Sequence, residues 1–375
     1  MPHKRDFKPY NVAGAYCVIA VFTFLLGLAP VLFNIAIDPY ELAGLRSTNL
    51  DRKQISEKAH YPLWKFSHYP REQASLVVLG DSRARSLRDK YWHELGAVEA
   101  FNFAYGGTTI YEIYDTFNYV KQNPSLKTLV VGIQLRSFDP EHKEGLNRVP
   151  EAISFTHNPL KYYSNWFVSR IGWRLMMDRY VEHLQKLSDL LPFSIREAKA
   201  EEAALQSTIS KQSFLDFEVC ERCVLPENIP ASILVPATFV SERPFTNQLR
   251  SWARLWTPVK IKRILGKKFR SQVEVNARSD WKNFQFSEDL WKKLEVISKW
   301  SHANDVDLVF VIPATIIEMQ NRITEFGYAE LNHRFRQRLT RLGIVFDFDY
   351  DNPVTRRITS FDDAYHANSR ISKQI

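Results

Sequence analysis

The stretch Leu76-Val77-Val78-Leu79-Gly80-Asp81-Ser82-Arg83 decides the fold of this chain. Four apolar residues in a row that end at a glycine are typical of a strand covered on both faces of a parallel sheet. Gly80 permits a tight turn at the strand end, because it has no Cβ. Residues 83–88 favour a helix, so we expect Ser82 at a helix N-terminus, where unpaired amides stabilise negative charge. The sequence therefore predicts an exposed serine hydroxyl, well placed for a nucleophile, after a buried strand.

A serine in such a turn is more often a helix cap than a nucleophile, so a base is required. Phe361-Asp362-Asp363-Ala364-Tyr365-His366, near the other end of the chain, supplies one. Residues three apart in a turn can face each other, so Asp363 can accept the Nδ1 proton of His366 and direct Nε2 at Ser82. Asp362, Asp347 and Asp349 are alternative acids with less suitable spacing. We expect Ser82, His366 and Asp363 to form a catalytic triad.

These two motifs, Gly80-Asp81-Ser82 and Asp363-x-x-His366, together resemble the SGNH (Gly-Asp-Ser-Leu) hydrolase superfamily. Two further blocks extend the resemblance. Residues 102–108, Asn-Phe-Ala-Tyr-Gly-Gly-Thr, are similar to the second family block, which assigns an oxyanion-hole amide to Gly107. Residues 132–135, Gly-Ile-Gln-Leu, fall where the family has Gly-x-Asn-Asp, so Gln134 takes the place of the asparagine donor. The resemblance thus implies an oxyanion hole made by Ser82, Gly107 and Gln134.

The pattern of the chain predicts an α/β fold, and the resemblance implies its form: a three-layer α/β/α, flavodoxin-like SGNH fold with a central parallel sheet. Apolar runs predict strands at residues 76–79, 100–103, 128–133, 307–312 and 344–346. A capping box, Thr109-x-x-Glu112, and a candidate N-cap, Ser287, mark two helix starts. Ser82, Gly107, Gln134 and His366 all follow strand ends, where an open parallel sheet gathers its site.

The segment from Val12 to Ile37 contains no charged residue. At about 1.5 Å per residue, its length exceeds the roughly 30 Å hydrocarbon core of a bilayer. Because no small-x-small cleavage site follows, we expect an uncleaved transmembrane helix rather than a signal peptide. Lys4, Arg5 and Lys8 precede it, whereas Asp38 and Glu41 follow it. This charge asymmetry predicts a single-pass protein of the bacterial inner (cytoplasmic) membrane, with its N-terminus inside and its folded part in the periplasm or outside the cell.

The same pattern divides the chain into segments. We expect a cytoplasmic tail (1–11), the anchor (12–37), a lead-in (38–72), two SGNH-like parts (73–138 and 287–375) and, between these parts, a large, mostly helical insertion or cap (139–286), which is too long for a crossover loop. The insertion is rich in aromatic residues: Tyr162, Tyr163, Trp166, Trp173, Trp252 and Trp256. We interpret them as core side chains; a groove for sugar rings is the alternative. The basic segment 250–270 is interpreted as a solvated helix face, with binding to headgroups or anionic polymer as the alternative.

The composition and the cysteines of the chain exclude few classes of function. The 375 residues carry 50 Lys and Arg against 42 Asp and Glu, a net charge of +8, and this mild surplus identifies no partner; we expect no nucleic acid. Cys17 lies in the anchor, and Cys220-Glu221-Arg222-Cys223 is the other cysteine motif. Cys220 and Cys223 can close a local disulfide, with free thiols, a redox centre or half of a zinc site as alternatives. Because no second pair or nearby histidine completes a metal site, we expect no metal, and no cofactor is implied.

A triad of this kind performs acyl transfer, and the acyl-serine then passes its group to water or to a sugar hydroxyl. An N-terminal anchor followed by an SGNH-like domain resembles the proteins that acetylate alginate and related exopolysaccharides, and the protein that helps to D-alanylate teichoic acids. The resemblance implies an esterase or O-acetyltransferase acting on a cell-surface or exported polysaccharide, with a multi-spanning membrane O-acyltransferase as partner. The alternative is a degenerate member that binds polysaccharide or scaffolds an assembly. Gln134, Arg83 and the short stretch after His366, which depart from the family, favour that alternative.

Overall fold

The computed structural model describes residues 12–44, 50–72, 74–94, 96, 99–189 and 266–373. The chain separates into two compact units. The first, called the anchor unit, comprises residues up to Pro70 together with Pro150–Pro192, and the second, called the sheet unit, comprises Arg71–Val149 and the rest of the chain from Phe193.

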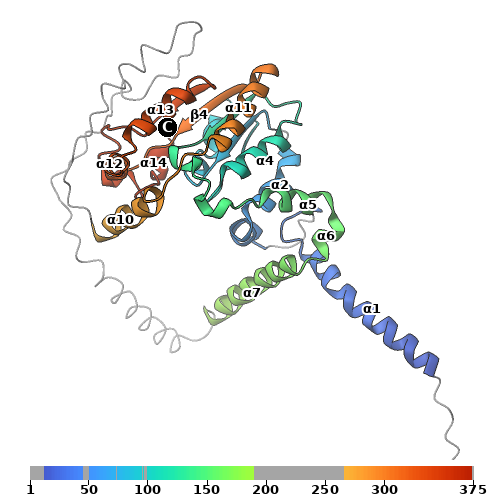
Figure 1. Ribbon diagram of the computed structural model, residues 1–375. Helices are drawn as coiled ribbons and strands as arrows, with labels where there is room; N and C mark the ends of the chain where they lie inside the picture. Colours follow the sequence, from blue (N-terminus) through green and yellow to red (C-terminus); the bar gives the residue numbers. More distant parts are fainter. Residues whose placement is uncertain are drawn as a thin grey trace, which may run out of the picture. The chain divides into compact units, whose positions relative to one another are not determined.

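The sheet unit contains five parallel strands in the order β2-β1-β3-β4-β5. Figure 1 labels β4 and several of the helices around the sheet. Their bounds are β1 (Leu76–Gly80), β2 (Ala100–Asn102), β3 (Thr128–Gly132), β4 (Asp307–Ile312) and β5 (Ile344–Asp347). The predicted α/β fold with a central parallel sheet is confirmed. The chain winds in one direction from β1 to β2 and in the other from β3 onward, so the carboxyl ends of β1 and β3 are the expected place for a ligand site.

Helices cover both faces of this sheet. On one face, α4 (Ile110–Val120) packs on β1 and on α11 (Glu288–Ala303), which in turn packs on β4. Helix α13 (Ala329–Leu339) joins them, since Phe335 contacts Trp291 of α11. The other face carries a short 3-10 helix, η2 (Ala84–Ser86), and the helices α3 (Asp89–Glu94) and α14 (Ser369–Ser372). All residues of β1 are buried, as a strand between two helical layers requires.

Local sequence signals explain where the longer helices begin. The predicted capping box is present at α4: the Thr109 hydroxyl accepts from the Glu112 amide, and the Glu112 carboxylate accepts from the Thr109 amide. The Ser287 hydroxyl accepts from the Leu290 amide and caps α11. Helices α10 (Lys267–Trp281) and α12 (Ile317–Glu325) pack against each other. The short 3-10 helices η3 (Leu135–Phe138), η4 (His142–Gly145) and η6 (Ile358–Ser360) complete the described part of this unit.

The turn after β1 differs from the prediction. Instead of a helix over residues 83–88, the chain forms only the three-residue η2, and α3 begins after a break at Leu87. The side-chain amide of Asn102 explains the break, because it donates to the carbonyls of Ala84 and Leu87, at 3.0 and 2.6 Å. Those carbonyls are thereby engaged outside a helix. The helix dipole expected at Ser82 is therefore limited to a single short turn.

Two glycines allow this turn to lie close to the sheet. Gly80 has φ +141°, and a Cβ there would lie 2.7 Å from both the Ala84 Cβ and the Gly132 carbonyl oxygen. A Cβ on Gly132 would lie 2.3 Å from the same Ala84 methyl. Ala84 is fully buried. The methyl of Ala84 thus occupies the space left by two missing side chains, at the paired ends of β1 and β3.

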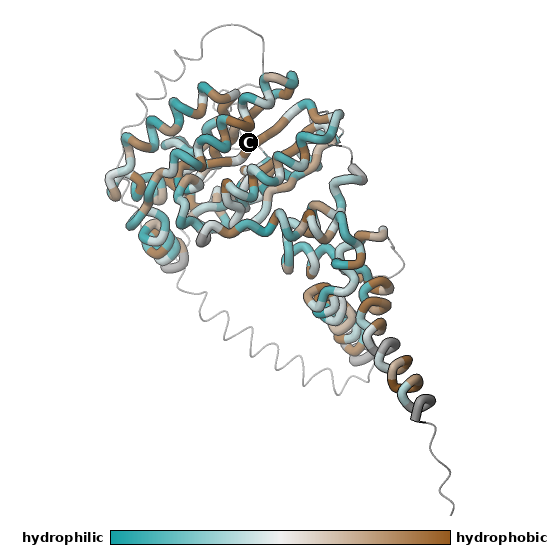
Figure 2. The backbone as a smooth tube through the Cα atoms, turned by 45° about the vertical axis from the view of Figure 1, so that its right-hand side comes forward, coloured by the Kyte–Doolittle hydropathy of each residue, from teal (hydrophilic) through white to brown (hydrophobic). Residues whose placement is uncertain are grey.

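The anchor unit begins with α1 (Val12–Ile37). From Tyr16 onward this helix is long and apolar enough to cross a membrane, and Figure 2 shows its largely hydrophobic residues. The side chains of its first described turns are exposed. A polar cluster follows at its carboxyl end. The buried Asn34 amide donates to the Ser169 hydroxyl at 2.9 Å and to the Tyr163 carbonyl at 2.6 Å. The Tyr162 hydroxyl donates to the Asp38 carboxylate at 3.2 Å and accepts from the Tyr40 amide.

These contacts join α1 to helices from the predicted insertion. The other elements of the anchor unit are η1 (Lys53–Glu57), α2 (Tyr61–Glu72), α5 (Val149–His157), α6 (Pro159–Tyr163) and α7 (Trp166–Asp189). Residues 139–286 are thus divided, with α5 to α7 in the anchor unit and α10 in the sheet unit. Of the aromatics interpreted as core, Tyr162 is buried, whereas Trp166 and Trp173 are 72% and 54% exposed, so that interpretation was wrong for both tryptophans.

Several predictions for this region lie outside the described residues. They concern the Cys220 and Cys223 pair, Trp252, Trp256 and residues 250–265 of the basic segment.

The contact between Ala84 and Gly132 can be tested by adding one methyl and removing the other. We expect Gly132→Ala to lower the stability of the protein by about 1–3 kcal/mol, because the new methyl overlaps the Ala84 Cβ in a packed core. Thermal unfolding of the full chain in detergent measures the change. The double variant Gly132→Ala, Ala84→Gly removes the overlap. We therefore expect its loss of stability to be smaller than the sum of the losses in the two single variants. If the stability losses of the two single variants simply add up in the double variant, the contact between Ala84 and residue 132 does not determine how closely the turn lies on the sheet.

Candidate active site

The structure brings Ser82, His366 and Asp363 together at the carboxyl edge of the sheet. The Nε2 atom of His366 lies 2.7 Å from the Ser82 hydroxyl oxygen. On the other side of the ring, Nδ1 lies 2.9 Å from both carboxylate oxygens of Asp363. With Nδ1 carrying its proton, Nε2 is free to accept the proton of the serine, which is the arrangement that activates a serine nucleophile.

Asp363 is held in place by its own turn. Its Oδ1 atom accepts hydrogen bonds from the backbone amides of Tyr365 and His366, each at 2.9 Å. Burial would raise the pKa of Asp363, but the hydrogen bonds from His366 and from these amides lower it to about 2. The carboxylate is therefore ionised at neutral pH and stabilises the positive charge that His366 gains when it accepts a proton.

The alternative acids are engaged elsewhere or exposed. Asp347 and Asp349 form ion pairs with Arg336, at 2.7 and 3.5 Å. Asp362 is exposed, although its amide donates to the His366 carbonyl at 2.9 Å. Together with the antiparallel bridge between Phe361 and Ala367, that bond fixes the loop that carries His366.

Asn102 connects the serine turn to the glycine loop after β2. Besides its two bonds to the carbonyls of Ala84 and Leu87, its side-chain oxygen accepts from the Ala104 amide at 2.8 Å. The side chain is 4% exposed, so each of these bonds replaces a contact with water that burial has removed. The sequence indicated Asn102 only as the first residue of the block that resembles the second family block; in the structure, its side chain fixes the distance between the two loops.

Of the expected oxyanion-hole residues, Ser82 and Gly107 line the same cleft. Gly107 has φ +72°, a conformation that favours glycine, and among the described residues neither its amide nor that of Ser82 donates a hydrogen bond. Gln134 is not among the cleft-lining residues, and its side-chain amide lies 3.4 Å from Asp81 Oδ2. Two backbone amides are thus available to a ligand, whereas the Gln134 side chain is turned toward Asp81.

A network of charged and aromatic side chains adjoins the serine, and the sequence analysis did not identify it. Asp81 accepts from the Arg83 amide at 2.9 Å and from the Arg83 guanidinium at 2.7 Å. Arg136 lies 3.7 Å from Asp81 and donates to Asp280 of α10 at 2.8 Å. Asp280 also accepts from the Tyr365 hydroxyl at 2.6 Å, and the Arg136 guanidinium stacks on the Tyr365 ring. The network therefore links the residue before Ser82 to the residue before His366.

Burial and charge pairing act in opposite directions on these groups. Burial would raise the pKa of Asp81, but the nearby Arg83 and Arg136 guanidinium groups lower it to about 2. Burial raises the pKa of Tyr365 far above its usual value, and the negative charge of Asp280 adds to this effect, although Arg136 opposes it. At neutral pH, Asp81 is thus ionised and held by its ion pairs, and Tyr365 is neutral and donates a hydrogen bond to Asp280.

The sequence offered little signal for this network. Arg136 and Tyr365 lie two residues and one residue from predicted site positions, but nothing in their spacing indicated a contact. Asp280 lies far along the chain, in the predicted insertion, and only the packing of α10 brings it to the site.

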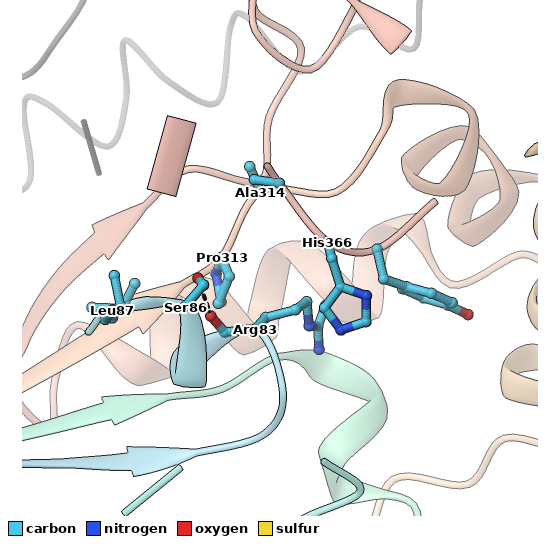
Figure 3. A pocket seen from close by; sticks show the side chains of 9 residues that line it. Arg83, Ser86, Leu87, Pro313, Ala314 and His366 are labelled. Atoms are coloured by element: carbon cyan, nitrogen blue, oxygen red, sulfur yellow. Dashed lines mark hydrogen bonds between the residues drawn. The ribbon is translucent and has the colours of Figure 1, made fainter. Parts of the chain in front are cut away.

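Ser82 opens into a cleft of about 590 Å³. Its lining is mainly polar: Asp81, Ser82, Gly107, Arg136, Asp139, Glu141, His142, Asn276, Ser279, Asp280, Asn283 and Tyr365. On another side, His366 borders a small recess of about 20 Å³ with Arg83, Ser86, Leu87, Pro313 and Ala314 (Figure 3). That recess holds one water molecule at most. Of these two spaces, only the large polar cleft has room for a substrate beside Ser82.

Neither a candidate metal site among the described residues nor a matching known protein identifies this site further. Within the part of the chain that the structure describes, no group of three or more His, Cys, Asp or Glu side chains is placed to hold a metal ion. No protein-family model and no curated protein matches the sequence.

Asp81 is predicted to stabilise the fold in a pH-dependent manner. Its pKa is about 2 in the folded chain, against an ordinary value of 3.8, so its contribution is complete above pH 4 and is lost as the pH falls toward 2. We expect Asp81→Asn to cost about 2 kcal/mol at pH 7, because two arginines lose their counter-charge.

Unfolding of both proteins in detergent, followed across this pH range, should show their difference shrinking below pH 4. Asp289→Asn, which removes an exposed carboxylate paired only with Lys292, is the matched control and should change stability little. A difference between wild type and Asp81→Asn that stays constant down to pH 3 would contradict the assignment.

Proposed function

We propose that this protein is a membrane-anchored serine esterase or O-acyltransferase of the SGNH type, acting outside the cytoplasm on a cell-surface or exported polysaccharide. The observation that carries the proposal is the continuous hydrogen-bonded series from Asp363 through His366 to the Ser82 hydroxyl. A serine that only caps a turn requires neither a histidine at 2.7 Å nor an ionised carboxylate behind that histidine.

The reaction follows from this geometry. The Ser82 oxygen attacks the carbonyl carbon of an ester as its proton moves to His366 Nε2, and the carbonyl oxygen becomes an oxyanion. The backbone amides of Ser82 and Gly107 are available to stabilise that oxyanion. The intermediate then collapses: the carbon–oxygen bond to the leaving alcohol breaks, and the alcohol takes the proton from His366. An acyl-serine remains.

The second half-reaction repeats these steps with a new nucleophile. Water or a sugar hydroxyl gives its proton to His366 and attacks the acyl carbon, and Ser82 leaves as the alcohol after it recovers that proton. Water makes the protein an esterase, and a sugar hydroxyl makes it an O-acyltransferase. Asp363 keeps its negative charge throughout, since its pKa is about 2.

The lining of the cleft supports a hydroxyl-rich substrate. Asn276, Ser279 and Asn283, on and just after α10, present amide and hydroxyl groups beside Ser82, and Asp139 and Glu141 line the cleft with carboxylates. Such groups bind sugar hydroxyls, whereas a long acyl chain requires an apolar lining. The resemblance to alginate O-acetylation and teichoic acid D-alanylation proteins points in the same direction, with a multi-spanning membrane O-acyltransferase as the donor partner.

The N-terminal segment supports the proposed location. Lys4, Arg5 and Lys8 precede the apolar helix, and Asp38 and Glu41 follow it. By the positive-inside rule, the sheet unit then lies on the outer side of the inner membrane, where exported polysaccharide is available.

Covalent labelling tests the nucleophile. We expect a fluorophosphonate probe to label the full-length protein in detergent, Ser82→Ala to abolish the label, and His366→Ala or Asp363→Asn to slow labelling by at least about tenfold. Ser125→Ala, just before β3 at the opposite edge of the sheet, and His302→Ala, an exposed residue at the end of α11, are controls that should label normally.

Two results would overturn the proposal. One is a folded wild-type protein that stays unlabelled, which would favour the binding or scaffolding alternative. The other is a label that persists in Ser82→Ala.

The polar cleft makes a separate prediction about specificity. Neither Asn276 nor Asn283 has a side-chain hydrogen-bond partner among the described residues, so both amides are available to a substrate. We expect the double variant Asn276→Ala, Asn283→Ala to raise KM for O-acetylated xylo-oligosaccharides about tenfold, the equivalent of one lost hydrogen bond. Hydrolysis of p-nitrophenyl acetate, which is too small to reach both amides, should be unchanged. Equal loss on both substrates would argue against a sugar subsite here.

A further inference from the structure

Helix α7 (Trp166–Asp189) carries large apolar side chains on two opposite sides. One side is buried within the anchor unit and includes Val168, Ile171 and Leu175. The other side is exposed and includes Trp166, Trp173, Met177, Tyr180 and Leu184, each more than 45% exposed. The exposed residues recur at intervals of seven, four, three and four, so they form one stripe along the helix. We call this set the α7 stripe.

The stripe is too large and too regular to be ordinary surface. Single exposed apolar residues are common, but a contiguous row that contains two tryptophans and a tyrosine marks a surface that binds something apolar. The buried side already satisfies the packing of the helix. The fold of the anchor unit therefore does not require large apolar residues on the exposed side of α7.

The stripe starts at the membrane helix. The Trp173 ring stacks on the Phe33 ring of α1, with centroids 5.4 Å apart, and Gly172 lies against Phe33 and Ile37. Beyond this contact the two helices separate: the earlier turns of α1 are exposed, and α7 runs away from the carboxyl end of α1 (Figure 1). Met177, Tyr180 and Leu184 continue the stripe past the contact.

The position of Phe33 along α1 determines how deep in the bilayer the contact with Trp173 lies. The apolar part of α1 covers 22 residues, Tyr16–Ile37, which at about 1.5 Å per residue just spans a hydrocarbon core of roughly 30 Å. Phe33 and Ile37 therefore lie within about one turn of the outer boundary, where the buried polar groups of Asn34 and Asp38 begin. Trp173, stacked on Phe33, lies at the depth that tryptophan and tyrosine prefer in membranes.

The bilayer that α1 crosses is thus the occupant that fits the stripe. Its aromatic and methionine side chains suit the boundary between headgroups and acyl chains, and Arg170 and Arg174, both exposed on one flank, can reach lipid phosphates with their long side chains. We propose that α7 is an interfacial membrane helix whose stripe is immersed in the outer leaflet beside α1. The anchor unit is then fixed to the bilayer by two elements, and α7 restricts its tilt and rotation about α1.

Spin-label accessibility tests this proposal and does not depend on the chemistry of Ser82. The full chain, with its three cysteines replaced, is reconstituted in phosphatidylcholine nanodiscs, and a nitroxide is attached at Met177→Cys or at Leu184→Cys. Asp178→Cys and Glu182→Cys, exposed positions on the same helix but outside the stripe, are matched controls. We expect the ratio of oxygen to nickel-chelate collision rates to be several-fold higher at the two stripe positions than at the controls.

Two outcomes would overturn the proposal. Equal, high accessibility to the nickel chelate at stripe and control positions would place the stripe in water. Protection of the stripe positions from both oxygen and nickel chelate would show that a protein surface, such as a second copy of the chain, covers the stripe instead of lipid. Because every substituted side chain is exposed, the variants should retain the unfolding temperature of the cysteine-free parent.

Discussion

The close contact between Ala84 and the two strand-end glycines is the constraint on which the site depends. With Gly80 and Gly132 paired at the ends of β1 and β3, the methyl of Ala84 can lie directly on the sheet, and the intervening Asp81-Ser82-Arg83 turn must be tight. Asn102 then binds the carbonyls of the same turn and joins it to the loop that carries Gly107. A side chain at either glycine would move the turn that carries Ser82 away from the loop that carries Gly107.

Two carboxylates near Ser82 have similar lowered pKa values for different reasons, and the difference separates their tasks. Asp81 lies between Arg83 and Arg136, so its negative charge stabilises the turn and neutralises the two buried guanidinium groups. Among the described residues, Asp363 accepts hydrogen bonds from the imidazole and from backbone amides, so its charge remains available to a histidine that gains a proton. Because an uncompensated buried charge is costly, the pairing of Asp81 and Asp280 with the arginines also keeps these groups fixed while a substrate is bound.

The anchor unit shows how a helix that is long and apolar enough to cross a membrane continues into a folded unit. The last turn of α1 carries Asn34, and Asp38 follows it; both are fully buried and hydrogen-bonded to α6 and α7 or to adjacent backbone. The Asn34 side-chain nitrogen and the Asp38 carboxylate, at the end of this helix, are thus bound by other groups of the protein. This arrangement gives α1 a defined orientation relative to α7, which a flexible lead-in over residues 38–72 would not provide.

The sequence by itself determined the parallel sheet, the apolar N-terminal helix and the grouping of Ser82, His366 and Asp363, because each depends on a short pattern: an apolar run before a glycine, an uncharged segment, or an acid three residues before a histidine. Only the tertiary structure decided the rest. It replaced the helix after Ser82 with a short turn, since Asn102, distant in sequence, binds its carbonyls. It divided the predicted insertion between two units and brought Asp280 to Arg136 and Tyr365. These features depend on contacts between residues far apart in the chain, and such contacts leave no periodicity or spacing in the local sequence from which they could be inferred.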